Sequence, residues 1–178
     1  EPDQIQAIID KAVGIFGRLD CLFNNAGHNL PFRPFCETAV DEVTELLRTN
    51  FISQFVACQH ALPHLRVTKD SIINMSSCTA QLGQKGNAVY AATKGAVSAF
   101  TKSLALEEAA HGVRVNAVLP GSIYTDGRRR FIESQGEQGL ETERLAESLQ
   151  PMGRSGTPQE AGQVVLFLAS EAASFLTG

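Results

Sequence analysis

The sequence lacks the long apolar stretch of a membrane-spanning helix. No uninterrupted apolar run in its 178 residues approaches the roughly 18–20 residues that a membrane span needs. The first ten residues also lack the basic start and the apolar middle of a secretory signal. We therefore expect a protein of the cytoplasm.

Cysteine is sparse, and no C-x-x-C pair occurs. The four cysteines are widely spaced at Cys21, Cys36, Cys58 and Cys78. This spacing gives neither the dense framework of a disulfide-rich secreted domain nor the paired ligands of a zinc site. His60 and His64 lie four residues apart, but without a Glu between them or an evident third ligand they do not predict a metal site. We expect free thiols and no bound metal.

A strong charge of either sign, low complexity and internal repeats are also absent. The net charge is −4, and 19% of the residues are charged. Mild acidity argues against a nucleic acid or an anionic membrane as the main partner. With 43% hydrophobic residues, the chain can form one domain over residues 1–178 around one sizeable core. We therefore expect the function to depend on a local binding or catalytic site rather than on a charged surface.

Hydrophobic spacing predicts alternating helices and strands. Apolar residues at helical spacing predict helices over residues 3–16, from Thr38 to about Pro63, over 87–110 and from Pro158 onward. Short apolar runs predict strands over 19–23, 71–75 and 113–119. Thr38 with Asp41, and Thr157 with Glu160, resemble capping boxes at helix starts. This order predicts an α/β fold, a doubly wound parallel sheet with helices on both faces.

The polar segment 126–150 has no strong period. It carries an arginine run, Arg128 to Arg130, and charged helical stretches. We interpret the segment as a flap over a pocket. The arginine run is interpreted first as a solvated face and second as a guide for an anionic ligand.

Polar turns follow all three predicted strands, at 24–27, 76–78 and 120–125. The carboxyl ends of parallel strands meet at one edge of a sheet, where α/β proteins bind ligands. Three candidate loops are therefore expected at one edge.

Tyr90 and Lys94 stand four residues apart on the predicted long helix, so they share one face. A phenol titrates near 10, and a nearby ammonium favours the phenolate, so the pair suits acid–base chemistry. The alternative is a half-buried tyrosine beside a solvated lysine. Ser77 closes the second strand and could donate a hydrogen bond to a substrate carbonyl. Asn50 shares the inward face of its helix with Leu46 and Leu47, which predicts a buried polar partner or water.

These residues occur together with further motifs in one order. They are Asn24-Asn25-Ala26-Gly27, Asn50, Ser77, Tyr90-Ala91-Ala92-Thr93-Lys94 and Pro120-Gly121-Ser122-Ile123-Tyr124-Thr125. In order and spacing they resemble the short-chain dehydrogenase/reductase family. The resemblance implies a Rossmann-like fold, NAD as cofactor with NADP not excluded, and hydride transfer to or from a secondary alcohol or ketone. It also implies a homodimer or homotetramer.

The resemblance extends to the 17β-hydroxysteroid dehydrogenases within that family. It rests on Leu19-Asp20-Cys21 leading into Asn24 to His28, on 77–84 and on Gly112 to Asn116. A 17β-hydroxysteroid is therefore one candidate substrate.

The resemblance also implies roles for single residues. Tyr90 would be the general acid or base, Lys94 would lower its pKa and hold the nicotinamide ribose, and Ser77 would orient the substrate oxygen. Asn50 would bind a water that links Lys94 to solvent. The implied cofactor contacts are Asn24, Ala26, Gly27, Tyr90, Lys94, Pro120, Gly121, Ile123 and Thr125. The implied substrate contacts are His28, Ser77, Gln84 and Tyr90.

The chain departs from the family at both ends. The family's first strand, its glycine-rich phosphate turn and the residue that selects NAD or NADP are missing, and the chain stops at Phe175 to Gly178, where the last strand would begin. We expect a part of a longer polypeptide. The alternative is a truncated, non-catalytic variant that acts through subunit association. A third and weaker hypothesis is that the protein is an epimerase of the extended family, but such enzymes do not usually carry the Asn-Asn-Ala-Gly run.

Overall fold

The computed structural model describes residues 2–178, which divide into two compact units. The first unit holds the residues up to Leu119 together with Phe167–Gly178, and the second holds Pro120–Leu166. Each unit is described by itself below.

A three-stranded parallel sheet lies at the centre of the first unit. The strands β1 (Cys21–Asn24), β2 (Ser71–Met75) and β3 (Arg114–Val118) lie in the order β1-β2-β3. In this register Asn24 lies opposite Asn74, and Ile72 opposite Val115. The predicted parallel sheet is confirmed.

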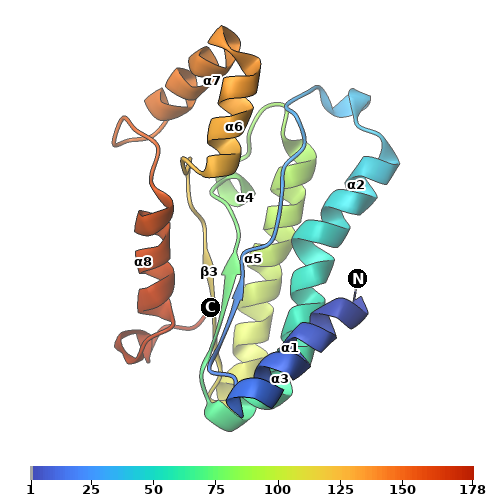
Figure 1. Ribbon diagram of the computed structural model, residues 1–178, viewed down its shortest axis with the longest axis vertical. Helices are drawn as coiled ribbons and strands as arrows, with labels where there is room; N and C mark the ends of the chain where they lie inside the picture. Colours follow the sequence, from blue (N-terminus) through green and yellow to red (C-terminus); the bar gives the residue numbers. More distant parts are fainter. Residues whose placement is uncertain (1) are drawn as a thin grey trace. The chain divides into compact units, whose positions relative to one another are not determined.

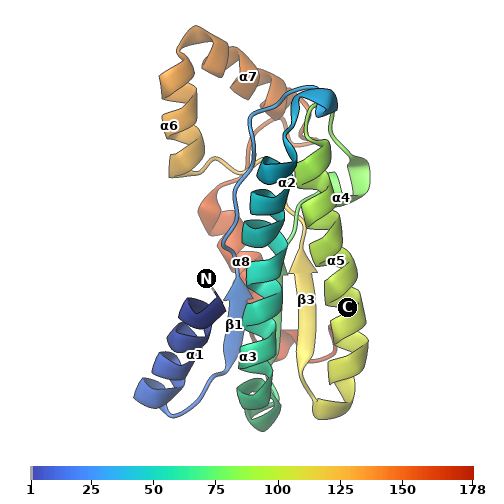
Figure 2. The same ribbon diagram turned by 90° about the vertical axis from the view of Figure 1, so that its right-hand side faces the viewer.

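Three helices cover one face of this sheet: α1 (Pro2–Phe16), α3 (Ser53–Thr68) and α5 (Ala88–Glu108). Figures 1 and 2 show them on the same side of the strands. The core beneath them consists of buried apolar side chains from these helices and from the strand region, namely Ile9, Cys58, Ala61, Leu65, Ile72, Leu104, Ala105, Val113 and Val115. Burial of these faces explains the helical spacing seen in the sequence. None of the helices in the described residues is long and apolar enough to cross a membrane.

Short elements join the main ones in the first unit. They are η1 (Phe35–Glu37), α2 (Val40–Leu47), η2 (Arg48–Ile52), α4 (Thr79–Leu82), η3 (Ala109–His111) and η4 (Glu171–Ala173). The segment η2 is a turn of π-helix between α2 and α3. Such turns are rare and occur often at functional sites, and this one contains Asn50.

The helix predicted from Thr38 begins one residue later than a Thr38 cap requires. Ala39 is the N-cap, and its backbone N–H donates to Glu42 Oε2 at 3.0 Å. The Thr38 N–H instead donates to the Phe35 carbonyl and closes the preceding 3₁₀ turn. Glu42 also forms an ion pair with Arg33. The prediction of a Thr38–Asp41 capping box was therefore wrong.

The same helical stretch continues past Pro63, where the sequence predicted its end. Helix α3 reaches Thr68 and is closed by Lys69, whose φ is 57°. Ala61 and Leu65, on either side of the proline, are fully buried. Their packing offsets the hydrogen bond that a proline removes from a helix interior.

The C-terminal residues of the first unit lie against β3. Thr177 Oγ1 accepts from the Val115 N–H at 3.0 Å, the Gly178 N–H donates to the Val115 carbonyl at 2.9 Å, and Asn116 Nδ2 donates to the Leu176 carbonyl. Residues 176–178 thus satisfy backbone groups on the free side of β3.

The second unit contains three helices: α6 (Asp126–Gln135), α7 (Glu137–Ser148) and α8 (Pro158–Leu168), whose last two residues belong to the first unit. Two of these occupy the segment interpreted as a flap. They approach closely at Gly139, where a Cβ would lie 2.3 Å from the Ile132 carbonyl oxygen.

The predicted capping box at the start of α8 is confirmed. The Thr157 N–H donates to Glu160 Oε2 at 2.8 Å, and Thr157 Oγ1 accepts from the Glu160 N–H at 3.2 Å.

Shortening one core side chain tests the packing of the first unit. Replacing the fully buried Leu65 by alanine should lower the free energy of unfolding by about 2–5 kcal/mol, because apolar contacts are lost and a cavity remains. Chemical denaturation measures this loss. The matched control is Val67→Ala, two residues along the same helix and 82% exposed, which should change stability by less than about 0.5 kcal/mol. Equal effects of the two changes would contradict the assigned core.

Candidate functional site

The Asn50 side chain fixes the loop that follows β1. Its Oδ1 accepts from the His28 N–H at 2.9 Å, and its Nδ2 donates to the His28 carbonyl at 2.9 Å and to Thr93 Oγ1 at 3.1 Å. The predicted buried polar partner of Asn50 is thus the backbone of His28 together with Thr93. The Asn50 side chain thus connects the backbone of this loop to Thr93 of α5.

Lys94 is buried at the same place. It is 3% exposed, and its Nζ donates to the Met75 carbonyl at the end of β2 at 2.8 Å. Burial lowers the pKa of Lys94 to about 8. A Cβ on Gly27 would lie 3.0 Å from Asn50 Oδ1 and 3.5 Å from Lys94 Nζ. Gly27 therefore lets the loop backbone pass close to both side chains.

Tyr90 and Ser77 bring two hydroxyl groups together. The phenol of Tyr90 and the hydroxyl of Ser77 form a hydrogen bond, and Lys94 Nζ lies 5.7 Å from the centre of the Tyr90 ring. Ser77 Oγ also accepts from the N–H and the hydroxyl of Thr79. The geometry thus unites Ser77, Tyr90 and Lys94, as the sequence predicted.

The pKa of Tyr90 differs from the expectation. Burial raises this pKa, and the hydrogen bond with Ser77 opposes the rise without reversing it. The expected lowering by Lys94 is absent, because burial disfavours the phenolate of Tyr90 just as it disfavours the ammonium of Lys94. Both groups are shifted toward their neutral forms.

Asn24 occupies the interior rather than an open surface. Its Nδ2 donates to Asn74 Oδ1 at 2.8 Å and contacts Cys58 Sγ at 3.4 Å, and Asn74 Nδ2 donates to Thr101 Oγ1. The following residues, from Asn25 to His28, are exposed. The open part of this turn is therefore its backbone and the predicted contacts Ala26, Gly27 and His28.

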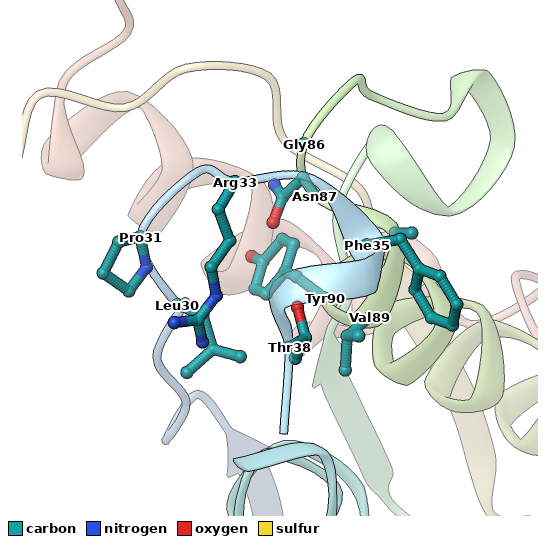
Figure 3. Close-up of a pocket in the computed structure, with 10 residues that line it drawn as sticks. Leu30, Pro31, Arg33, Phe35, Thr38, Gly86, Asn87, Val89 and Tyr90 are labelled. Carbon is teal, nitrogen blue, oxygen red and sulfur yellow. The ribbon is translucent and has the colours of Figure 1, made fainter. Parts of the chain in front are cut away.

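A small cavity of about 20 Å³ adjoins Tyr90. Figure 3 shows Arg33 and Leu30 on one side of it and Tyr90 and Val89, from α5, on the other. Arg33, Thr38 and Asn87 supply its polar lining. These three residues were not found from the sequence, because no local motif marks them.

Gln84 is brought only to the edge of this region. It is exposed, and its Oε1 accepts from Asn87 Nδ2 at 2.9 Å, just before α5 begins. No hydrogen bond in the described part of the chain joins Gln84 to Ser77 or Tyr90. Its role as a substrate contact stays a prediction.

The remaining predicted residues, Pro120, Gly121, Ile123 and Thr125, lie in the second unit. A hollow of about 300 Å³ occurs there, lined by Gly121, Ser122, Ile123, Gln150, Pro151, Met152, Arg154, Gly156 and Glu160. Thr125 caps α6 by accepting from the Arg128 N–H at 3.2 Å. Pro120 and Thr125 are not among the residues that line the hollow.

Arg129 and Arg130 are exposed, as expected for a solvated face, whereas Arg128 is half-buried and held in an ion pair. Its Nε donates to Glu143, whose carboxylate is largely buried. Arg129 in turn contacts Glu133 on the exposed side of α6.

The cysteines and acidic side chains provide no metal centre among residues 2–178, since no group of three or more potential His, Cys, Asp or Glu ligands occurs there. All four cysteines are free thiols, as expected. Burial raises the pKa of Cys58 to about 12, so this thiol is a packing residue rather than a nucleophile.

Replacing Lys94 by methionine tests the cost of its burial. The pKa falls from 10.5 to about 8, and each unit corresponds to about 1.4 kcal/mol, so the charged side chain costs up to about 3 kcal/mol of stability at pH 7. We expect Lys94→Met to unfold at higher denaturant concentration than the wild type at pH 7.

The stability difference between Lys94→Met and the wild type should depend on pH. Between pH 8 and 10.5 the folded state has released the Lys94 proton while the unfolded state still holds it, so stability contributed by this group rises with pH and is lost as pH falls through 8. The advantage of Lys94→Met should therefore shrink from pH 7 to pH 9.5. The exposed Lys102→Met on the same helix is the control and should show no such trend. A constant difference between Lys94→Met and wild type would overturn the assignment.

Comparisons with known proteins show which family the chain resembles. The family model described as Enoyl-(Acyl carrier protein) reductase matches residues 1–178. L-fucose dehydrogenase of Oryctolagus cuniculus is 43% identical over 176 residues, which cover 99% of this chain and 61% of that protein. The 3-oxoacyl-[acyl-carrier-protein] reductase FabG of Chlamydia pneumoniae is 37% identical over 179 residues, which cover 98% of this chain and 66% of that protein.

Two solved structures share the fold. ElxO with NADP bound has a TM-score of 0.92 and 35% identity, covering 99% of this chain and 70% of that chain. The ligand-free aldohexose dehydrogenase of Thermoplasma acidophilum has a TM-score of 0.91 and 34% identity, covering 99% and 71%.

The chain spans about three-fifths of the length of the L-fucose dehydrogenases that it matches. The match to the family model extends over all of its residues, and the three-stranded sheet with flanking helices is Rossmann-like. The chain belongs to the short-chain dehydrogenase/reductase family.

Proposed function

We propose that the protein is an oxidoreductase that uses NAD or NADP to interconvert a secondary alcohol and a ketone. The observation that carries this proposal is the cluster at the carboxyl edge of the sheet. The Tyr90 phenol hydrogen-bonds with Ser77 and lies beside the buried Lys94 ammonium. A phenol with a neighbouring hydroxyl and a nearby cation suits proton transfer to and from a carbinol oxygen.

The residues present fit a nicotinamide dinucleotide. The Met75 carbonyl takes one of the three N–H donors of Lys94, so the others can serve the ribose hydroxyls. The backbone of Ala26 and Gly27 is exposed, and the absent Cβ of Gly27 permits close approach. Pro120, Gly121, Ile123 and Thr125 are proposed as further cofactor contacts. Asn24 is proposed to contribute indirectly, because its side chain supports the turn that carries Ala26 and Gly27. ElxO, a structure of the same fold, binds NADP.

The side chains then have separate roles in the reaction. A bound nicotinamide supplies the hydride acceptor for oxidation and the donor for reduction. During oxidation Tyr90 Oη would accept the carbinol proton as the phenolate and become the phenol, and during reduction the phenol would donate that proton to the carbonyl oxygen; Ser77 Oγ would orient the substrate oxygen. Lys94 holds positive charge beside the phenol. Asn50 keeps the His28 loop in place, and we keep the proposal that it helps to position a water near Lys94.

Sugars are the substrate class that we favour. Relatives at 43% and 42% identity are L-fucose dehydrogenases, and a structural neighbour is an aldohexose dehydrogenase. Arg33, Thr38 and Asn87 give polar groups to the cavity beside Tyr90, but its volume of about 20 Å³ holds about one water, so the preference for sugars rests on the similar proteins.

A 17β-hydroxysteroid is the second candidate. The motive is the resemblance of residues 19–28 and 77–84 to 17β-hydroxysteroid dehydrogenase type 14, with His28 and Gln84 as the substrate contacts.

We also propose that copies of the chain associate as a homodimer or homotetramer in the cytoplasm. Exposed apolar side chains on η2, α3 and α5 support the association, namely Ile52, Phe55, Val67 and Leu106. Four free thiols agree with a reducing compartment. The non-catalytic alternative gains no support, because the Ser77, Tyr90 and Lys94 cluster is intact.

Removing the phenol hydroxyl tests the reaction. In the full-length protein, Tyr90→Phe should reduce kcat by about 10²–10⁴-fold, because the substrate oxygen loses its proton carrier. Nicotinamide absorbance at 340 nm measures turnover. The control Thr44→Val removes an exposed hydroxyl on α2 and should leave the rate unchanged. Undiminished turnover in Tyr90→Phe defeats the proposal.

A substrate panel separates the two substrate classes. With the wild-type protein and each of NAD and NADP, we expect kcat/KM for L-fucose or another aldose to exceed that for a 17β-hydroxysteroid by at least about tenfold, a difference of about 1.4 kcal/mol in transition-state binding. The reason is the similarity to L-fucose dehydrogenases and to an aldohexose dehydrogenase. The reverse order would assign the protein to steroids while leaving the Tyr90 chemistry intact.

A further inference from the structure

Ser122, in the second unit, has all of its polar groups bound to one neighbouring segment. Its N–H donates to Gln150 Oε1 at 3.2 Å, and its carbonyl accepts from the Gly156 N–H at 2.8 Å. Its hydroxyl lies 2.9 Å from Ser155 Oγ. Residues 150–156 therefore fix the backbone between Gly121 and Ile123.

The hydrogen bonds of this cluster have a defined direction. Ser155 Oγ donates its single proton to Glu143 Oε1 at 2.9 Å, since a carboxylate only accepts. The Ser122 hydroxyl must then be the donor toward Ser155. The chain of donors runs from Ser122 to Ser155 to Glu143, and Arg128 Nε donates to the other oxygen of the same carboxylate.

Glu143 is a carboxylate buried within the second unit, which is unusual for a charged side chain. It is 8% exposed and Ser155 is 7% exposed. A carboxylate taken out of water is retained only where a cation and hydrogen-bond donors compensate it. Arg128 and Ser155 supply this compensation from α6 and from the segment after α7, so one buried charge connects three parts of the unit.

The wall of the 300 Å³ hollow is set by the same cluster. Ser122 and Gln150 both line this hollow. A Cβ on Gly121 would lie 2.4 Å from Gln150 Oε1, so the Gln150 amide packs directly on the backbone of Gly121. Displacing this cluster would change the path of Gly121 to Ile123.

We infer that Glu143 is a positioning residue: acting through Ser155 and Ser122, it holds the Gly121–Ile123 backbone in the form that binds the nicotinamide cofactor. The inference rests on the proposed function, because it takes Gly121 and Ile123 as cofactor contacts. Glu143 itself touches neither cofactor nor substrate. Its effect is therefore expected on cofactor affinity rather than on the chemical step.

The test uses Ser155→Ala and Glu143→Gln in the full-length protein. Ser155→Ala removes the link to Ser122, and Glu143→Gln places an amide donor against Arg128. Each change should raise the Kd for NAD or NADP, whichever binds the wild type more tightly, by about tenfold, as the loss of a charge-assisted hydrogen bond implies. Isothermal titration calorimetry measures Kd. At saturating cofactor, kcat should change less than about twofold.

The control is Glu133→Gln, which removes an exposed carboxylate from its contact with Arg129 on α6. Its Kd should stay within twofold of the wild type. A double-mutant cycle then tests the route: if Glu143 acts through both serines, Ser155→Ala should add little to the effect of Ser122→Ala. Additive effects, or an unchanged Kd in either test variant, would overturn the inference.

Hydrogen exchange gives a readout that needs no cofactor. The amides of Ser122 and Tyr124, which donate to Gln150 and Gly156, should exchange several-fold faster in Ser155→Ala than in wild type or Glu133→Gln. A merely structural role would lower the melting temperature and the active fraction while leaving Kd unchanged. If the wild type binds neither cofactor, the proposed function fails; if it binds and turns over but Ser155→Ala behaves like wild type, only the present inference fails.

Discussion

The carboxyl edge of the sheet depends on the burial of one positive charge, the Lys94 ammonium. A charged group with 3% exposure is costly unless fixed dipoles replace its water. The Met75 carbonyl does so directly, by accepting a hydrogen bond from Lys94 Nζ. Three further features occur beside this charge: a glycine where the loop passes, a fully buried asparagine, and a π-helical turn that carries the asparagine. Each of these features departs from the local rules that favour stability, and such departures are expected at functional sites.

Much of this arrangement follows from patterns with a short range. The strand over residues 71–75 was predicted with its observed bounds, because a buried apolar run with polar ends leaves little choice. Thr157, Pro158 and Glu160 predicted the start of α8, because all three act within one turn. The Tyr90 and Lys94 pair was predictable for the same reason, since helical spacing alone places both side chains on one face.

Features decided by distant partners were not predictable. The capping residue Glu42 was missed in favour of Asp41, because its ion pair with Arg33 bridges nine residues. Helix α3 passes through Pro63 because the sheet packs against Ala61 and Leu65, which no local rule contains. The direction of the Tyr90 pKa shift was also missed. Spacing brings an ammonium near the phenol, but burial, which depends on the whole fold, acts more strongly on both groups.

In each unit an amide side chain pairs with the polar backbone groups of a loop that follows a strand. A loop at the end of a strand has backbone groups that no neighbouring strand satisfies, and these must be paired if the loop is to hold one shape. In the first unit the Asn50 amide pairs with both the N–H and the carbonyl of His28. In the second, Gln150 and Gly156 pair with the N–H and the carbonyl of Ser122, while Ser155 and Glu143 secure its side chain. The Asn50 amide in the first unit, and the Gln150 amide together with the backbone of Gly156 in the second, thus pair the polar backbone groups of these loops and hold each loop in one shape.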